Sequence, residues 1–143
     1  MSFYKKNQLS KIIIKKLLKD IFAKYPVEFA YLFGSMASGQ AGPLSDVDIA
    51  VYLEYHLPEK QQEEIIGALR SDIEKVLQMP DKIGLVLLNE ELPPALERDI
   101  VYDGKLIYVK NDTARAYYET DVICRWLDYK PHHDRFMKEI LNS

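Results

Sequence analysis

Two short apolar runs separated by a loop of small residues constrain the fold of this chain more than any other feature. Residues 29–33 and 49–53 are apolar and partly aromatic, as expected for buried strands. Between them lies a Gly-Ser pair, at Gly34 and Ser35, followed after ten residues by Asp-x-Asp, at Asp46 and Asp48. The sequence therefore predicts a strand, a turn with a loop, and a second strand that begins with two carboxylates.

The spacing of the two aspartates suggests a metal site. Successive side chains in a strand point to opposite faces, so Asp46 and Asp48 should point the same way while Val47 turns into the core. Their Cα atoms should lie about 6.6 Å apart, at about 3.3 Å per residue. Two such carboxylates can share an ion, and Mg²⁺ prefers a few carboxylate oxygens together with water and phosphate oxygens. The turn at Gly34 and Ser35 offers N–H groups and a hydroxyl that suit a phosphate.

This pattern resembles the nucleotidyltransferase superfamily of the DNA polymerase beta type. Within it, the chain is most similar to the minimal nucleotidyltransferases (MNT), which are often encoded beside HEPN-family ribonuclease toxins as their antitoxins. Gly34, Ser35, Asp46 and Asp48 match the signature G-S-x(10)-D-x-D, and the resemblance covers about residues 10–110. It implies catalytic Asp46 and Asp48 that hold Mg²⁺. The resemblance also implies that ATP is bound by Gly34, Ser35, Met36 and Ser45.

The chain departs from this family pattern at two places. Relatives commonly carry arginines in the loop after Gly-Ser, where this chain has Met36 and Ser38. Fully active relatives also carry a third acid on a later strand, where Gly84 stands here, and Asp81 lies three residues earlier. Three interpretations stay open: two aspartates suffice, another group replaces the third acid, or the activity is weak.

The resemblance favours an antitoxin that transfers AMP from ATP to a hydroxyl, with tyrosine preferred, of a cognate HEPN toxin. One alternative is a non-catalytic antitoxin that masks the toxin by direct binding. Another is a small-molecule nucleotidyltransferase, although such enzymes usually carry an additional helical domain for the acceptor. The sequence leaves open the acceptor residue, the nucleotide preference and the number of AMP groups added.

Composition narrows the class of protein. The 143 residues, 48% of them hydrophobic, suit one domain over 1–143, with a core at about 10–110 and a helical tail at about 112–143. A net charge of -3 argues against nucleic acid as a direct ligand.

A single cysteine, Cys124, excludes an internal disulfide and is expected to be a buried thiol. We find no signal peptide and no membrane span, and therefore expect a cytoplasmic protein.

The pattern of apolar residues predicts an α+β protein with the nucleotidyltransferase fold. We expect helices at about 10–24, 58–77 and 93–102, and strands at about 28–33, 46–53, 83–88 and 105–109. The strands should form a mixed four-stranded sheet with helices on one face, residues 83–88 in the centre and 105–109 at an edge. Pro131 should divide the tail into two short helices, 113–127 and 132–141. The aromatic residues of the tail suit either a protein interface or the core.

Overall fold

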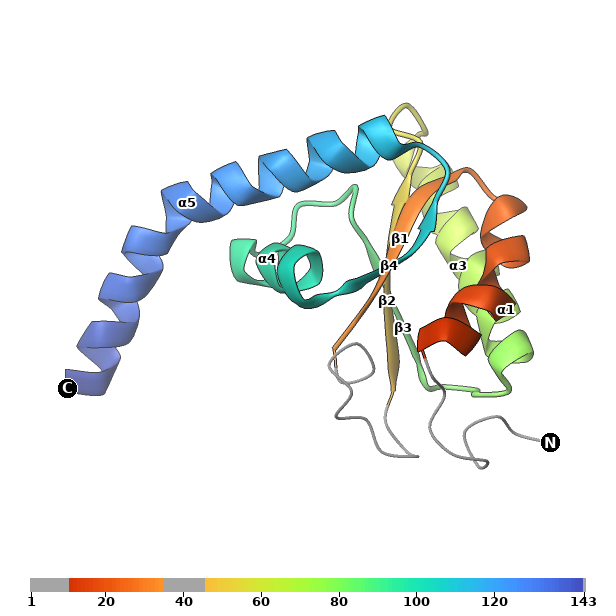
Figure 1. Cartoon of the computed structure of the whole chain (residues 1–143), viewed down its shortest axis with the longest axis horizontal. Helices are drawn as coiled ribbons and strands as arrows, with labels where there is room; N and C mark the ends of the chain where they lie inside the picture. The colour runs from red at the N-terminus through yellow and green to blue at the C-terminus, as the bar shows by residue number, and fades with distance from the viewer. Residues whose placement is uncertain (1–10, 35–45, 143) are drawn as a thin grey trace.

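The protein forms a sheet with helices on both of its faces (Figure 1). The structure is a computed structural model and describes residues 11–34 and 46–142. In chain order the elements are α1 (Lys11–Ala23), β1 (Val27–Phe33), β2 (Val47–Leu53), α3 (Glu59–Leu77), β3 (Ile83–Leu87), α4 (Pro94–Asp103), β4 (Lys105–Val109) and α5 (Asp112–Asn142). The predicted order of helices and strands up to β4 is confirmed.

The described strands form one mixed sheet in the order β3-β2-β1-β4. Strand β1 is antiparallel to both β2 and β4, whereas β2 and β3 run parallel. The predicted edge position of β4 is confirmed, but the prediction that residues 83–88 form a central strand is wrong. Strand β3 is apolar although it lies at an edge, because α3 covers Ile83, Leu85 and Leu87 on one face while Val86 packs on the other.

Helices α1 and α3 cover one face of the sheet. Ile14, Leu18 and Phe22 of α1 are fully buried, at the helical spacing that the sequence indicates. They pack with Leu69 and Ile73 of α3 in a continuous core. Alternate residues of β2 point into this core, which anchors the strand that carries the two aspartates. These residues are Val47, Ile49, Val51 and Leu53.

Helices α4 and α5 cover the opposite face, so the prediction of helices on one face is wrong. Phe29, Ala50 and Ile100 form a second core there, together with Tyr118 and Val122 of α5. The physical reason is visible in β1, where consecutive residues are buried rather than alternate ones. A strand of this kind must have both faces covered.

The tail is one helix, α5, rather than two short ones. Pro131 lies inside it. A proline removes one backbone hydrogen bond and crowds the preceding turn, which can bend a helix without ending it. Figure 1 shows α5 starting after β4, running past α4 away from the sheet, and then bending in its second half. Cys124 is exposed, contrary to the prediction, because α5 buries the face that carries Tyr118 and Val122.

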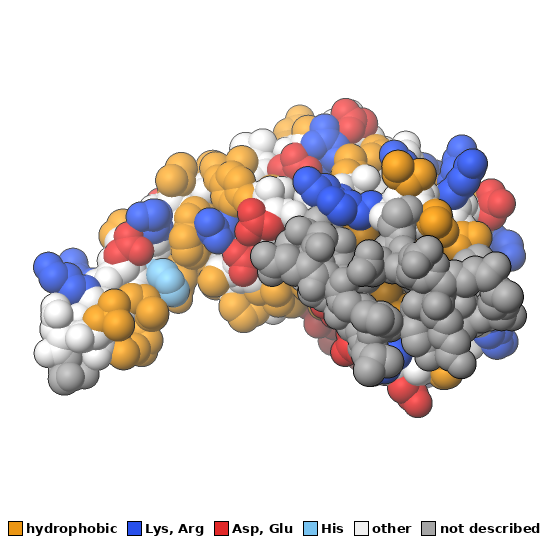
Figure 2. Space-filling view, turned by 60° about the horizontal axis from the view of Figure 1, so that its bottom comes forward, with side chains coloured by type: hydrophobic (Ala, Val, Ile, Leu, Met, Phe, Trp, Pro, Cys, Tyr) orange, Lys and Arg blue, Asp and Glu red, His pale blue; other side chains and the backbone are white. Residues whose placement is uncertain are grey.

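The part of α5 beyond the sheet displays apolar side chains (Figure 2). The exposed members are Leu127, Phe136, Met137, Ile140 and Leu141. Of the aromatic residues in the predicted tail, Tyr118 packs on the core, whereas Tyr117 and Phe136 are exposed. No helix in the described part of the chain is both long and apolar enough to cross a membrane.

Candidate functional site

Asp46 and Asp48 lie at the start of β2, on the edge of the sheet where β1 ends. Asp46 directly precedes the strand and is exposed, whereas Asp48 is its second residue and is partly buried. Val47 between them is fully buried in the α1–α3 core, as predicted. Asp48 therefore belongs to the face of the sheet that α4 and α5 cover further along.

Two glycines enclose the carboxylate of Asp48. Asp48 pairs with Phe33 of β1, the residue before Gly34, and with Gly84 of β3. A Cβ atom placed on Gly34 would lie 2.5 Å from Asp48 Oδ2, and one on Gly84 would lie 2.6 Å from Oδ1. Both distances are shorter than real Cβ contacts allow. Gly34 also adopts φ of 75°, a conformation that favours glycine.

The strand register settles where residue 84 points. Gly84 stands directly opposite Asp48 on the parallel strand, and its missing side chain would meet the Asp48 carboxylate. A third acid at this position would therefore have joined the pair, as the resemblance implies, and this chain lacks it. Asp81 lies in the turn before β3 and is exposed.

Charge within the site is unbalanced. Burial, and then the negative charge of Asp46, raise the pKa of the Asp48 carboxyl above its ordinary value. Lys82 offers a positive charge, with Nζ 3.7 Å from Asp46 Oδ1. Lys82 was not among the site residues predicted from the sequence. Lys82 directly precedes β3, the strand that pairs with β2. This position beside the start of β2 is the signal that could have pointed to Lys82.

The donor atoms fit a divalent cation that binds oxygen. Two carboxylates that repel each other are stabilised by a cation, and Mg²⁺ completes its shell with water and phosphate oxygens. Among the described residues, no group of three or more His, Cys, Asp or Glu side chains could hold a metal ion. An ion at Asp46 and Asp48 would take its further ligands from water and from phosphate oxygens.

The remaining predicted nucleotide-binding residues are Ser35, Met36 and Ser45. They lie outside the described residues, so their contacts with phosphate stay a prediction. Gly34 is described, and it stands next to Asp48. The structure thus brings together Gly34, Asp46 and Asp48 from the predicted set.

Comparison with protein families decides the assignment of the chain. Residues 16–113 match the family described as polymerase beta, nucleotidyltransferase. This chain belongs to that nucleotidyltransferase family. The match extends from α1 to the start of α5 and includes both aspartates and the two glycines that enclose Asp48.

Solved structures share the fold of this nucleotidyltransferase over nearly its whole length. A toxin–antitoxin structure with AMP-PNP is 22% identical, with a TM-score of 0.64, and the match covers 93% of this chain and 99% of the other. A second relative comes from a complex of the tri-AMPylated Shewanella oneidensis HEPN toxin with its MNT antitoxin. It is 21% identical, with a TM-score of 0.58 and coverage of 92% and 95%.

A third relative, also from Shewanella oneidensis, is 19% identical, with a TM-score of 0.62 and coverage of 90% and 97%. A comparison with curated proteins gave no match. These likenesses confirm the predicted nucleotidyltransferase fold, and they cover a larger share of the chain than residues 16–113 of the family match.

Proposed function

We propose that this protein is an antitoxin adenylyltransferase, which transfers AMP from ATP to a tyrosine hydroxyl of a cognate HEPN ribonuclease toxin. One observation carries the proposal. The chain matches, over 93% of its length and 99% of the other chain, a structure described as a toxin–antitoxin with AMP-PNP. A further structural relative comes from a complex whose HEPN toxin is tri-AMPylated. We also propose that residues 1–143 act as a single domain in the cytoplasm, where ATP is available.

The reaction is a displacement at the α-phosphorus of ATP. The tyrosine oxygen forms a bond to that phosphorus, the bond from it to the bridging oxygen of the β-phosphate breaks, and pyrophosphate leaves with the electron pair. Asp46 and Asp48 would hold Mg²⁺, which supplies positive charge beside the triphosphate when bound. Gly34, with Ser35, Met36 and Ser45, would bind the phosphates. The contribution of the protein is then mostly positioning and electrostatic stabilisation.

The phenol proton needs an acceptor, and Gly84 offers none. We propose that the proton passes to water or to a phosphate oxygen, which makes this enzyme slower than relatives that carry the third acid. Lys82 lies beside Asp46 and supports binding of the nucleotide by partly offsetting the negative charge of the site. It could fill part of the role that arginines play in the loop of other family members.

The decisive property of a catalytic antitoxin is turnover. We expect that a few per cent of this protein, relative to the toxin, inactivates the whole toxin pool when ATP and Mg²⁺ are present. The toxin should gain the mass of one or more AMP groups on tyrosine and stay inactive after the two proteins are separated. Inactivation that needs equal amounts of both proteins and no ATP would contradict this proposal.

A masking antitoxin is the second candidate, and the exposed apolar part of α5 favours it. Phe136, Met137 and Ile140 form a surface that a protein partner could cover. Masking predicts that ribonuclease activity returns in full when the toxin is separated, without a change in mass. The small-molecule alternative gains no such support, because the described tail is a single helix and not a helical domain.

A further inference from the structure

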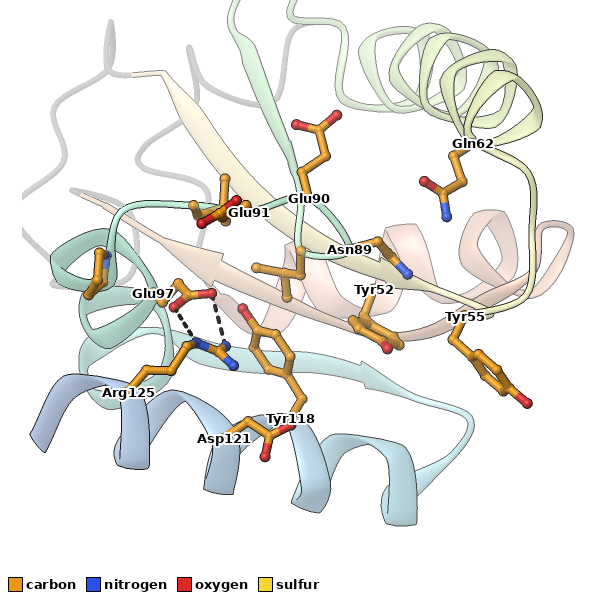
Figure 3. A pocket seen from close by; sticks show the side chains of 13 residues that line it. Tyr52, Tyr55, Gln62, Asn89, Glu90, Glu91, Glu97, Tyr118, Asp121 and Arg125 are labelled. Atoms are coloured by element: carbon orange, nitrogen blue, oxygen red, sulfur yellow. Dashed lines mark hydrogen bonds and ion pairs between the residues drawn. The ribbon is translucent and has the colours of Figure 1, made fainter. Parts of the chain in front are cut away.

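A pocket lies at the other end of the sheet face that carries Asp48 (Figure 3). It has a volume of about 580 Å³ and is bounded by the end of β2, the loop after β3, and helices α4 and α5. Tyr52 in its wall is four residues beyond Asp48, which corresponds to about 13 Å along the strand at 3.3 Å per residue. The pocket is therefore separate from the aspartate site.

Negative charge dominates this pocket. Glu90 and Glu91 stand on the loop after β3, and Asp121 projects from α5. None of these three carboxylates forms an ion pair with another described residue. Arg125 is the cation of the pocket lining, and its Nε and Nη2 donate to the two carboxylate oxygens of Glu97, each at 3.0 Å. A net negative pocket of this kind repels ATP and attracts a cation.

Aromatic rings and one unsatisfied hydroxyl add a second signal. The rings of Tyr52 and Tyr118 lie in the pocket wall with centroids 5.5 Å apart. The faces of tyrosine rings attract cations. Tyr118 is 93% buried, yet its hydroxyl has no hydrogen-bond partner among the described residues. Since buried polar groups are nearly always paired, a partner from outside the described chain is indicated.

The walls of the pocket are held in place without a ligand. The side chain of Asn89 donates to the carbonyl of Leu53 and accepts from its N–H group, both at 2.8 Å. This contact ties the loop after β3 to the end of β2. The Arg125–Glu97 pair ties α5 to α4 in the same way. A pocket with fixed walls loses little conformational entropy when it binds.

We propose that this pocket binds an organic cation, a guanidinium or an alkylammonium group, between its carboxylates and the rings of Tyr52 and Tyr118. The cation is either a free small molecule or an arginine or lysine side chain of a protein partner. Both sources would present the same cationic group to the pocket. The proposal does not depend on nucleotidyl transfer, because neither the pocket nor its test involves Asp46 or Asp48.

The test is a titration of the full chain with arginine amide, followed by calorimetry and by NMR, in the absence of ATP and Mg²⁺. We expect saturable one-to-one binding that shifts the ring signals of Tyr52 and Tyr118, and no binding of glutamate. A double variant, Asp121→Asn with Glu90→Gln, should bind about tenfold more weakly, since it removes two partly screened charge interactions.

The matched control is Asp128→Asn with Glu139→Gln, which removes the same charge from exposed positions on α5. It should bind arginine amide as the unchanged protein does. A pentapeptide with a central arginine between glycines distinguishes the two sources: binding at least as tight as that of arginine amide indicates a protein side chain, and weaker binding indicates a free cation. Absence of saturable binding, or equal weakening in both double variants, would overturn the proposal.

Discussion

At the scale of single residues, Asp48 shows how a proposed metal-binding side chain limits its neighbours. Its carboxylate lies between Gly34 and Gly84, and neither position has room for a Cβ atom while Asp48 stays where it is. The two glycines therefore have a role that neither helix nor strand propensity explains. Because residue 84 is a glycine, the chain has no third acid at this position. The same glycine leaves space for the carboxylate of Asp48.

Replacing Gly84 by alanine should lower transfer much more than stability. The new Cβ would lie 2.6 Å from Asp48 Oδ1, so the carboxylate must move. A misplacement of about 1 Å can cost about 100-fold in rate. The control is Gly67→Ala in α3, where nothing lies within 4 Å of the added Cβ. Gly67→Ala should raise the free energy of unfolding by about 0.5–1 kcal/mol and leave transfer unchanged. Equal AMP incorporation by both variants would show that the position of Asp48 is unimportant.

At the scale of elements, α5 is attached to α4 and to β1 through specific side-chain hydrogen bonds. Glu97 of α4 is 96% buried and pairs with Arg125 of α5. This pair was not predicted from the sequence, although Glu97 lies one helical turn before the buried Ile100 and so shares its face. A carboxylate on an apolar helix face is the signal that could have revealed a buried partner.

Arg125→Ala should lower the free energy of unfolding by about 1.5–3 kcal/mol, the range for hydrogen bonds to charged groups. The loss stays within this range because the Arg125 side chain is 46% exposed, so water can partly replace it. Lys130→Ala is the control, since Lys130 forms an exposed pair with Asp134 on the same helix, 2.6 Å long. Its effect should stay within about 0.5 kcal/mol. Denaturant unfolding of both variants measures the difference, and equal losses would contradict the structural role of the Glu97 pair.

Tyr31 links β1 to α5 and should make stability depend on alkaline pH. Burial, and then its hydrogen bond to Glu119, raise the pKa of the Tyr31 hydroxyl above its ordinary value. A group whose pKa is raised by folding stabilises the protein fully below its unfolded pKa, about 10 for tyrosine, and loses that effect as the pH rises further. The free energy of unfolding should therefore fall above about pH 10.

Tyr31→Phe should reduce this alkaline slope and cost about 1 kcal/mol at neutral pH, where the hydrogen bond is lost. Unfolding measured from pH 7 to 11 in both proteins tests the assignment. Tyr118→Phe is a useful comparison, because the Tyr118 hydroxyl has no partner among the described residues and its removal should not destabilise at pH 7. An unchanged slope in Tyr31→Phe would mean that Tyr31 ionises equally in both states.

The elements themselves were largely predictable, whereas their layers were not. Periodicity identified the buried stripe of α1 and the alternation in β2. Periodicity could not predict that α4 and α5 cover the second face of the sheet. It shows which side of a helix is buried, but not the surface against which that side packs. The continuity of α5 through Pro131 was also missed, since proline lowers the stability of a helix without always ending it.

At the scale of the whole molecule, one sheet face carries two separate polar regions. The aspartate site lies at the start of β2, and the acidic pocket lies beyond its end. The sequence predicted the first, because Asp46, Asp48 and Gly34 are close in the chain or joined by adjacent strands. It could not predict the second, which combines residues from β2, α4 and α5 that only the fold brings together.

We propose that Asp46 and Asp48 carry out AMP transfer and contribute nothing essential to the fold. Because the pKa of Asp48 is raised by burial and by Asp46, its charge destabilises the folded protein at neutral pH. Asp48→Asn should therefore be at least as stable as the unchanged protein. The control is Asp20→Asn, an exposed aspartate on α1 that is distant in sequence from the site.

The most direct measurement is the intact mass of a HEPN toxin after incubation with ATP, Mg²⁺ and each of the three proteins, with thermal unfolding recorded in parallel. We expect AMP addition by the unchanged protein and by Asp20→Asn. We expect none by Asp48→Asn, although its melting temperature is equal or higher. AMP addition by Asp48→Asn at the rate of the unchanged protein would contradict the account.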